Sequence, residues 1–430
     1  MKPPCFHPAA ALALGLAVAA LGWAGPALAA DGIQAARRQK EEISPNINQV
    51  AGSAWETSPP KLSLGDNASL RLMAQIRVRY DDNIFASGVN QVSDTIVSVT
   101  PGLEFLFGHN SRIRGSLFYQ EAFTRYLDGA APNANLGTGR AAIGFESGRL
   151  ALAGRIALQQ LYQNNQDVAG LGQTTVTRTD VLNIHTSAES PLTAKTSLAV
   201  GADINRNQYK TAGLIGSRDL TLPLKVFFEM TPKVAVSTGF SYGKVTPQGG
   251  GPESRDLDYN IGARGNFTSK LSGTLSVGYR TRRVGTEPAE NMWGFDGAFD
   301  YEMTPQVSSS FVLSRNFGIG SQGQSLKSNS YSFELTAAPT PQWRFGTGLA
   351  YRHVAYGARV FLPPPVVGSS PPPTPTDRSD DYWEGNVQAT YFPGGSFSTS
   401  LGYTLSSNRS TLPGARYSGN VLNLLLGWQY

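Results

Sequence analysis

Apolar and polar residues alternate strictly along a stretch that begins at Ser69. The apolar residues occupy every second position: Leu70, Leu72, Ala74, Ile76, Val78 and Tyr80. The positions between them are mostly polar or charged: Arg71, Met73, Gln75, Arg77 and Arg79. A period of two is typical of a β-strand with one face in an apolar environment. An arginine near the middle of a bilayer costs about 2–4 kcal/mol, so we expect the aliphatic face to meet lipid and the arginines to point into a wet interior.

The same alternation recurs in later segments of the chain. Clear examples cover residues 234–242, 271–279, 293–301, 343–351 and 397–403. Aromatic residues gather at the ends of these segments, as in the belts that transmembrane barrels place at the two membrane surfaces. The 47 glycines and 17 tyrosines suit a protein of strands, turns and such belts.

The connections between these segments alternate in length. Eight tight turns are expected at residues 108–111, 146–149, 190–193, 230–233, 268–270, 303–306, 339–342 and 393–396. Nine longer loops begin near residues 85, 129, 167, 211, 248, 285, 318, 357 and 407. The loop from Gly357 to Asp380 holds two proline triplets and should be extended, either folded over the mouth or projecting outward.

Eight turns and nine loops make 17 connections and hence 18 strands. The third and sixth strands are irregular, so a count of 16 also fits. We predict an all-β fold: a transmembrane, antiparallel, up-and-down β-barrel over residues 69–430, with short periplasmic turns and longer extracellular loops. A barrel of this size leaves an aqueous channel. A soluble propeller or solenoid would show a fixed repeat, and we find none.

The chain ends in a further alternating strand, from Asn420 to Tyr430. A closed barrel needs such a strand, because its last strand must pair with its first. Trp428 and Tyr430 resemble the C-terminal signal that the barrel-assembly machinery recognises. We therefore expect that machinery and outer-membrane lipid to be partners of this chain.

The first 29 residues have the features of a cleaved signal peptide. Lys2 precedes an apolar run, and Ala27-Leu28-Ala29 has the small-x-small pattern of a cleavage site. Cys5 lies within this segment, so the mature chain would carry no thiol chemistry. Residues 30–68 are expected to be a periplasmic linker or tail. The predicted location is the outer membrane of a Gram-negative bacterium.

Charge and composition exclude several classes of function. The formal charge of +5 falls to about +4 without Lys2, too little to indicate a nucleic-acid partner. No motif predicts a metal site or a cofactor. His109 falls in a predicted turn, His353 has outward parity, and the parity of His185 is not fixed by the sequence. We predict no enzymatic activity, and a membrane-embedded hydrolase becomes attractive only if His185 lies beside a serine.

Charged residues of inward parity are the main candidate functional set. They comprise Arg71, Arg77, Arg79, Arg114, Arg140, Arg155, Arg264, Arg280, Arg344, Arg352, Glu104, Glu146, Asp203, Asp296, Asp300, Glu302 and Glu334. An arginine-rich wall would attract anionic solutes, since charges in the lumen tune selectivity. Alternatively, the arginines pair with carboxylates across the lumen. The presence of both signs favours this second interpretation.

Asp81, Asp82 and Asn83 end the first strand at the expected outer mouth. Clustered oxygen ligands of this kind suit Ca²⁺. The simpler interpretation, which we favour, is a polar cluster that starts a turn and needs no ion.

The stretch from Arg79 to Phe85, with Ser93-Asp94-Thr95-Ile96 and Val99-Thr100-Pro101-Gly102-Leu103, resembles the first hairpin of the β-barrel porin type 2 family. The resemblance covers this hairpin alone. It implies an outer-membrane barrel, in some members associated with exopolysaccharide biosynthesis.

Together these features predict a passive, porin-like pore for a small polar solute or a polysaccharide. A non-conducting structural or surface-display barrel is the alternative, favoured if loops or residues 31–68 fill the lumen. The sequence does not indicate an oligomeric state.

Overall fold

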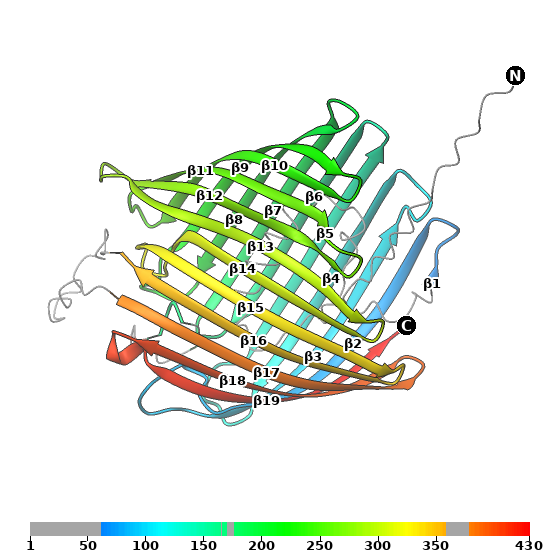
Figure 1. The fold of residues 1–430 in the computed structure, drawn as a ribbon. Coiled ribbons are helices and arrows are strands. Elements are labelled where there is room, and N and C mark those ends of the chain that lie inside the picture. The colour runs from blue at the N-terminus through cyan, green and yellow to red at the C-terminus, as the bar shows by residue number, and fades with distance from the viewer. Residues whose placement is uncertain (1–61, 165, 170–175, 358–377) are drawn as a thin grey trace, which may run out of the picture.

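The structure is a computed structural model that describes residues 62–164, 166–169, 176–357 and 378–430 (Figure 1). The predicted signal peptide and nearly all of the predicted linker lie outside these residues. Nineteen strands and one 3₁₀ helix, η2 (Pro413–Ala415), make up the described fold. A two-residue strand, β1 (Leu62–Ser63), comes first. The other strands are β2 (Ala68–Asp81), β3 (Asp94–Phe107), β4 (Ile113–Tyr126), β5 (Ala134–Ser147), β6 (Leu150–Tyr162), β7 (Arg178–Pro191), β8 (Thr196–Tyr209), β9 (Gly216–Thr231), β10 (Val234–Gln248), β11 (Ser254–Asn266), β12 (Leu271–Val284), β13 (Glu290–Thr304), β14 (Val307–Ile319), β15 (Ser325–Thr340), β16 (Trp343–Tyr356), β17 (Arg378–Gly394), β18 (Phe397–Ser410) and β19 (Tyr417–Gln429).

Strands β2 to β19 close into an antiparallel ring of 18, as the count of connections predicts (Figure 1). Each strand pairs with the next, and β19 pairs with β2 to complete the ring. The last residue takes part in the closure: the Tyr430 N–H donates to the Leu72 carbonyl at 2.8 Å, and the Leu72 N–H donates to the Tyr430 carbonyl at 2.9 Å. The two irregular strands, β4 and β7, are both members of the ring, so the alternative count of 16 is wrong.

The barrel begins slightly earlier than predicted. Leu62 and Ser63 pair with Leu70 and Ser69, so the end of the predicted linker folds back onto β2 as an extra edge. None of the helices in the described residues is long and apolar enough to span a bilayer.

The two faces of the sheet divide as the alternation predicts. On β2, Ile76 and Val78 lie on the outer surface with 46% and 38% of their area exposed, whereas Arg71 is only 5% exposed and faces the lumen. On β12 the outer positions are Leu275, Val277 and Tyr279, which alternate with inward Thr274, Ser276 and Arg280. Since register partners share a face, this division continues around the ring.

The eight tight turns lie at one end of the barrel and the nine longer loops at the other. We call these the turn end and the loop end. Both β2 and β19 reach the turn end, so the C-terminus and the start of the ring lie together there (Figure 1). At several turns a threonine hydroxyl accepts backbone N–H groups: the Thr231 Oγ1 bonds Val234 at 3.0 Å, and the Thr268 Oγ1 bonds Leu271 at 2.9 Å. Threonine therefore fixes both turns, and in the first of them Pro232 also presets φ.

One predicted boundary is wrong. The proline-rich loop was expected to run to Asp380, but β17 begins at Arg378, and Asp380 is fully buried. The polar run Arg378-Ser379-Asp380-Asp381 is typical of a loop, yet it forms a strand because its alternate residues have polar partners. Residues 358–377 lie outside the described residues.

A substitution pair on β12 tests the division of faces. Val277→Arg should lower the free energy of unfolding by about 2–4 kcal/mol, because it places a charge against lipid at mid-strand. Its neighbour Ser276→Arg faces the lumen and should change stability by less than about 1 kcal/mol. Urea unfolding from lipid vesicles, followed by tryptophan fluorescence, measures both. Equal losses in the two variants would contradict the assignment.

Candidate functional site

The inner wall carries buried ion pairs rather than isolated charges. Arg71 Nη1 lies 2.7 Å from Glu104 Oε2 across the β2–β3 ladder, and both side chains are almost fully buried. Arg280 of β12 contacts Asp296 of β13 and lies 3.5 Å from Asp258 of β11. Strand register places Arg71 directly opposite Glu104 and Arg280 directly opposite Asp258. Asp296 stands on the same inward face, four residues along β13 from the register partner of Arg280.

Two further pairs extend this pattern. Arg282 donates to the Asp256 carboxylate at 2.6 and 2.7 Å. Arg264 of β11 reaches Glu189 of β7 at 2.5 Å, with its guanidinium 3.5 Å from the centre of the Phe227 ring. Strands β8 to β10 lie between the two partners, so this contact spans the concave inner wall.

The remaining predicted lumen residues also keep their inward parity. Arg79 lies 3.7 Å from Asp81, and Arg344 stands over the Phe392 ring at 5.5 Å. Arg77 and Arg155 are half-buried on the same wall. Those nearer the turn end are Arg114, Asp300 and Glu302. The pairing seen on this wall favours mutual neutralisation over a free arginine wall.

The loop between β6 and β7 contacts a distant part of the inner wall. Its base is fixed by Asn164, whose side-chain oxygen accepts the Thr177 N–H at 3.0 Å and the Thr177 hydroxyl at 2.8 Å. Val176 packs at this base against Ile84 and Tyr126 of the neighbouring wall.

Beyond this base, Gln166 and Asp167 contact β16 and β17. Asp167 Oδ1 accepts from Arg352 Nη2 at 2.9 Å and from the Tyr356 hydroxyl at 3.1 Å. The Gln166 carbonyl accepts from Arg378 Nη2 at 2.8 Å. We call these residues, with Asp380, the clamp: Asp167, Arg352, Tyr356, Arg378 and Asp380.

Strand order shows that this loop crosses the lumen. Counting round the ring, β7 is nine strands from β16 one way, and β6 is seven strands from β17 the other. The two walls are therefore nearly opposite in a ring of 18, and Gln166 and Asp167 contact inward side chains of the wall that is distant from their own strands. This loop, which we call the crossing loop, occupies part of the channel near its loop end.

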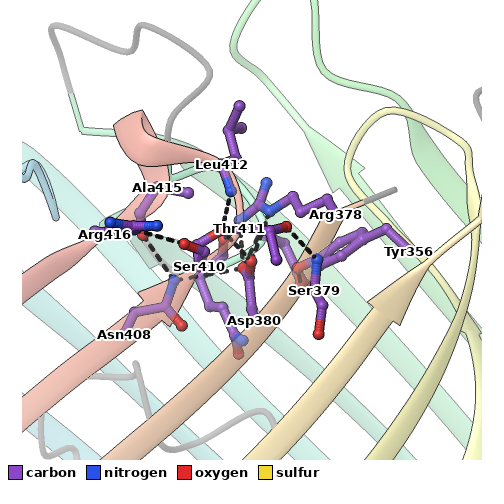
Figure 2. Close-up of polar contacts among 12 residues, drawn as sticks. Tyr356, Arg378, Ser379, Asp380, Asn408, Ser410, Thr411, Leu412, Ala415 and Arg416 are labelled. Carbon is purple, nitrogen blue, oxygen red and sulfur yellow. Dashed lines mark hydrogen bonds and ion pairs between the residues drawn. The ribbon is translucent and has the colours of Figure 1, made fainter. Parts of the chain in front are cut away.

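The clamp is built on a buried charge at the start of β17. Asp380 is fully buried and accepts from Arg378 Nε and Nη2 at 2.5–3.1 Å, and from the Ser410 hydroxyl at 2.6 Å (Figure 2). Asn408 donates to the Ala415 carbonyl at 2.7 Å, which ties η2 to the same group (Figure 2). The Arg378 guanidinium also lies over the Tyr356 ring, 4.5 Å from its centre.

Apolar contacts and a second loop hold the crossing loop in place. Ala169 packs against Ala86, Tyr382, Ala415 and Tyr417, which come from two other loops and from β17 and β19. In the β14–β15 loop, the Ser321 hydroxyl donates to the Asp167 carbonyl at 2.6 Å, and its own carbonyl accepts from the Ile215 N–H at 2.7 Å. Five loops thus meet at the loop end.

The cluster at the end of β2 acts as a turn. Asp81 accepts from the Asn83 N–H at 3.0 Å, and Asp82 accepts from the Asn420 N–H at 2.7 Å. The Asn83 amide donates to the carbonyls of Ser87 and Ser418. The Asp82 carboxylate and the Asn83 side-chain amide thus join β19 to the β2–β3 loop. Among the described residues, no group of three or more His, Cys, Asp or Glu side chains is placed to hold a metal ion.

The structure fixes the parity of the histidines. His185 faces the lumen, and its Nδ1 lies 2.5 Å from Asp203 Oδ1; within the described residues its ring bonds this carboxylate and no serine hydroxyl. His353 faces outward and lies 2.9 Å from Asp381, and His109 is in a tight turn beside Ser69.

Sequence reasoning missed most of the clamp. Only Arg352 was assigned inward from its parity; Asp167 lies in a loop, and Arg378 and Asp380 were placed in the proline-rich loop. The spacing of Arg378 and Asp380, two residues apart, is a signal for one shared face of a strand. Nothing in the sequence pairs Asp167 with Arg352.

Comparisons with known proteins give shape alone. No family model matches the chain, so the resemblance of its first hairpin remains a prediction, and no curated protein matches it. Among solved structures it is similar to OpdO of Pseudomonas aeruginosa, with 11% identity over 85% of this chain and 97% of that one and a TM-score of 0.43. The outer membrane protein opdK of P. aeruginosa has 10% identity over 84% and 98%, with a TM-score of 0.42. The siderophore receptor PirA of P. aeruginosa has 8% identity over 87% and 81%, with a TM-score of 0.42. At these values the likeness carries no argument about solute or mechanism.

The clamp predicts a large effect of removing one charge. Arg378→Met leaves the buried Asp380 carboxylate without its guanidinium and should lower the free energy of unfolding by about 3 kcal/mol. The double variant Arg378→Met/Asp380→Asn removes both charges and should recover more than half of that loss. Urea unfolding in lipid vesicles measures the free energy of unfolding of each variant. Additive losses in the double variant would show that the two side chains are not coupled.

Proposed function

We propose that this chain is an outer-membrane barrel that forms a passive, constricted pore for polar solutes. The observation that carries the proposal is the closed ring of strands with an apolar outer surface and a charged, hydrogen-bonding lumen. A closed ring leaves no unpaired strand edge, which is what a bilayer requires of a β structure. Solutes would then diffuse through the lumen, selected by size and charge at the crossing loop.

Location and assembly belong to the same proposal. The outward aliphatic residues would contact outer-membrane lipid, and the signal peptide would direct export. Trp428 and Tyr430 would be recognised by the barrel-assembly machinery. Their rings stack at 6.3 Å with an interplanar angle of 11°, at the turn end of the closing strand, which supports a shared recognition surface.

One observation favours a second candidate, a non-conducting structural barrel. The crossing loop contacts the distant wall and four other loops contact it or its partners, so the loop end is partly covered. If these loops seal the channel, the protein would act through its surface alone. Conductance distinguishes the two candidates directly.

The pore proposal predicts steady conductance from purified protein in planar bilayers. Asp167→Ala removes the contacts to Arg352 and Tyr356, so the crossing loop should loosen and the conductance should rise roughly two-fold as the narrowest section widens. Glu287→Ala is the matched control, because it removes one acidic charge from an exposed loop at the same end. No conductance from folded protein would support the structural barrel, and an equal rise in both variants would contradict the role of the crossing loop.

The resemblance of the first hairpin supports a sharper proposal, that the solute is a polysaccharide. A chain threading the constriction would interrupt the ionic current. We expect neutral and acidic polysaccharides to produce transient current blockades, which become shorter in Asp167→Ala because the constriction is wider. Monosaccharides of the same composition are the control. Blockades absent with every polysaccharide, in a channel that conducts, would restrict the proposal to small solutes.

A further inference from the structure

The outer surface of β8 to β12 carries a compact group of basic side chains near the loop end. Alternation along each strand places them on the outer face, next to outward aliphatic and aromatic residues. We call this set the basic patch: Arg206 of β8, Arg218 of β9, Lys244 of β10, Arg255 of β11 and Arg283 of β12. The four arginines are exposed, and Lys244 is half-buried.

Register brings these like charges into direct opposition. Arg206 pairs with Arg218 across the β8–β9 ladder. Arg255 pairs with Lys244 on one side and with Arg283 on the other. Like charges directly opposite on a sheet are destabilising, so the arrangement calls for an anion from outside the chain.

The chain supplies one carboxylate next to the basic patch, Glu253, which pairs with Lys244 and also attracts Arg255. The Lys244 ammonium lies 2.8 Å from Glu253 Oε1, and this hydrogen bond lowers the pKa of the Glu253 carboxyl below its usual value. Within the part of the chain that the structure describes, the four arginines have no carboxylate within ion-pairing distance. The lumen differs sharply, since Arg280, Arg282 and their neighbours there are paired with aspartates.

Other parts of the outer rim carry mixed charges. On β16 and β17, His353 faces Asp381, which also accepts from the Tyr351 hydroxyl at 2.7 Å. On β7, Asp180 lies 3.2 Å from Lys210. Outward Arg125 of β4 and Arg315 of β14 also stand outside the ion pairs of the described residues, but only in the sector from β8 to β12 do basic residues stand opposite one another in register.

Height on the barrel identifies the surroundings of the patch. Moving from the patch toward the turn end, the next outward residues on the five strands are Ile204, Leu220, Tyr242, Leu257 and Thr281. Tyr259 and Tyr279 follow on β11 and β12. Tyrosines of this kind mark the boundary between the hydrocarbon and the headgroups. The patch thus lies at the level of the headgroups on the loop side of the membrane.

We propose that the basic patch binds the phosphate groups of a phosphorylated glycolipid in the outer leaflet. This inference rests on the proposed outer-membrane location. Arginine suits phosphate because its planar guanidinium donates two parallel hydrogen bonds. The acyl chains of the same lipid would lie along outward Leu220, Leu222 and Leu224. Two phosphates on one headgroup would match the two opposed groups of the patch, Arg206 with Arg218 and Arg255 with Arg283.

Binding of lipid A to purified protein in non-ionic detergent tests the proposal, with bound lipid counted by native mass spectrometry. The variant replaces all four arginines, Arg206→Gln, Arg218→Gln, Arg255→Gln and Arg283→Gln. The matched control removes four exposed basic residues from the tight turns: Arg112→Gln, Arg149→Gln, Lys195→Gln and Lys233→Gln. Conductance is recorded on every variant, so a failure of glycolipid binding is separable from a failure of the pore.

We expect the patch variant to bind lipid A at least ten-fold more weakly than the wild type, since each basic residue at a headgroup surface contributes to affinity. The control variant should bind as the wild type does, and dephosphorylated lipid A should bind weakly to all three proteins. Conductance should be unchanged. Equal affinity in patch and control variants would overturn the proposal, as would full competition by inorganic phosphate alone at millimolar concentration, because that would indicate a simple anion site.

Discussion

The pairing of β19 with β2 is the interaction on which this structure depends. Every strand in a bilayer must satisfy its backbone N–H and C=O groups within the protein, because hydrocarbon offers no partner. The ring meets that requirement only if its last strand bonds its first, and the bonds between Tyr430 and Leu72 complete it at the final residue. The division into a lipid-facing and a water-facing side follows from this closure, since an open sheet would have no separate lumen.

Much of the fold could be predicted from the sequence because a period of two is a local property. Register makes the consequences long-range: once Arg71 and Arg77 are inward, their partners on β3 and β19 must be inward too. The turns were equally predictable, since Thr231-Pro232 and similar pairs fix the chain locally. The number of strands followed from counting these turns and loops.

The constriction could not be predicted in the same way. Asp167 lies in a loop, and a loop carries no periodic signal that says where it folds. Its partners Arg352 and Tyr356 stand on a strand almost opposite in the ring, at a sequence distance of 185 and 189 residues. Only closure of the barrel brings these groups within reach. Asp380 was not predicted for a related reason. Its neighbourhood in the sequence, Arg378-Ser379-Asp380-Asp381, is as polar as a solvated loop, and only the partners that the fold brings to it show that its carboxylate is buried.

The two charged regions of the barrel use opposite arrangements. In the lumen, arginines pair with carboxylates from the same wall, from more distant strands or from the crossing loop, so they stabilise the wall and constrain the crossing loop. On the outer face of β8 to β12, the arginines stand opposite one another and form no ion pair with a carboxylate among the described residues. Both arrangements arise from the same alternation, because one shift of parity moves a residue from one surface to the other.

Closure itself can be measured with a single disulfide. Register partners in an antiparallel pair have Cα atoms about 4.5–5.5 Å apart, within the range that a disulfide spans. Cys5, the chain's one cysteine, lies in the predicted signal peptide, so Leu424→Cys with Val78→Cys would place two thiols at opposed positions of β19 and β2. Oxidation of the assembled protein should then give an intramolecular cross-link in high yield, whereas Leu424→Cys with Val277→Cys should give none. A cross-link that forms only between molecules, or equally in both pairs, would contradict a closed barrel.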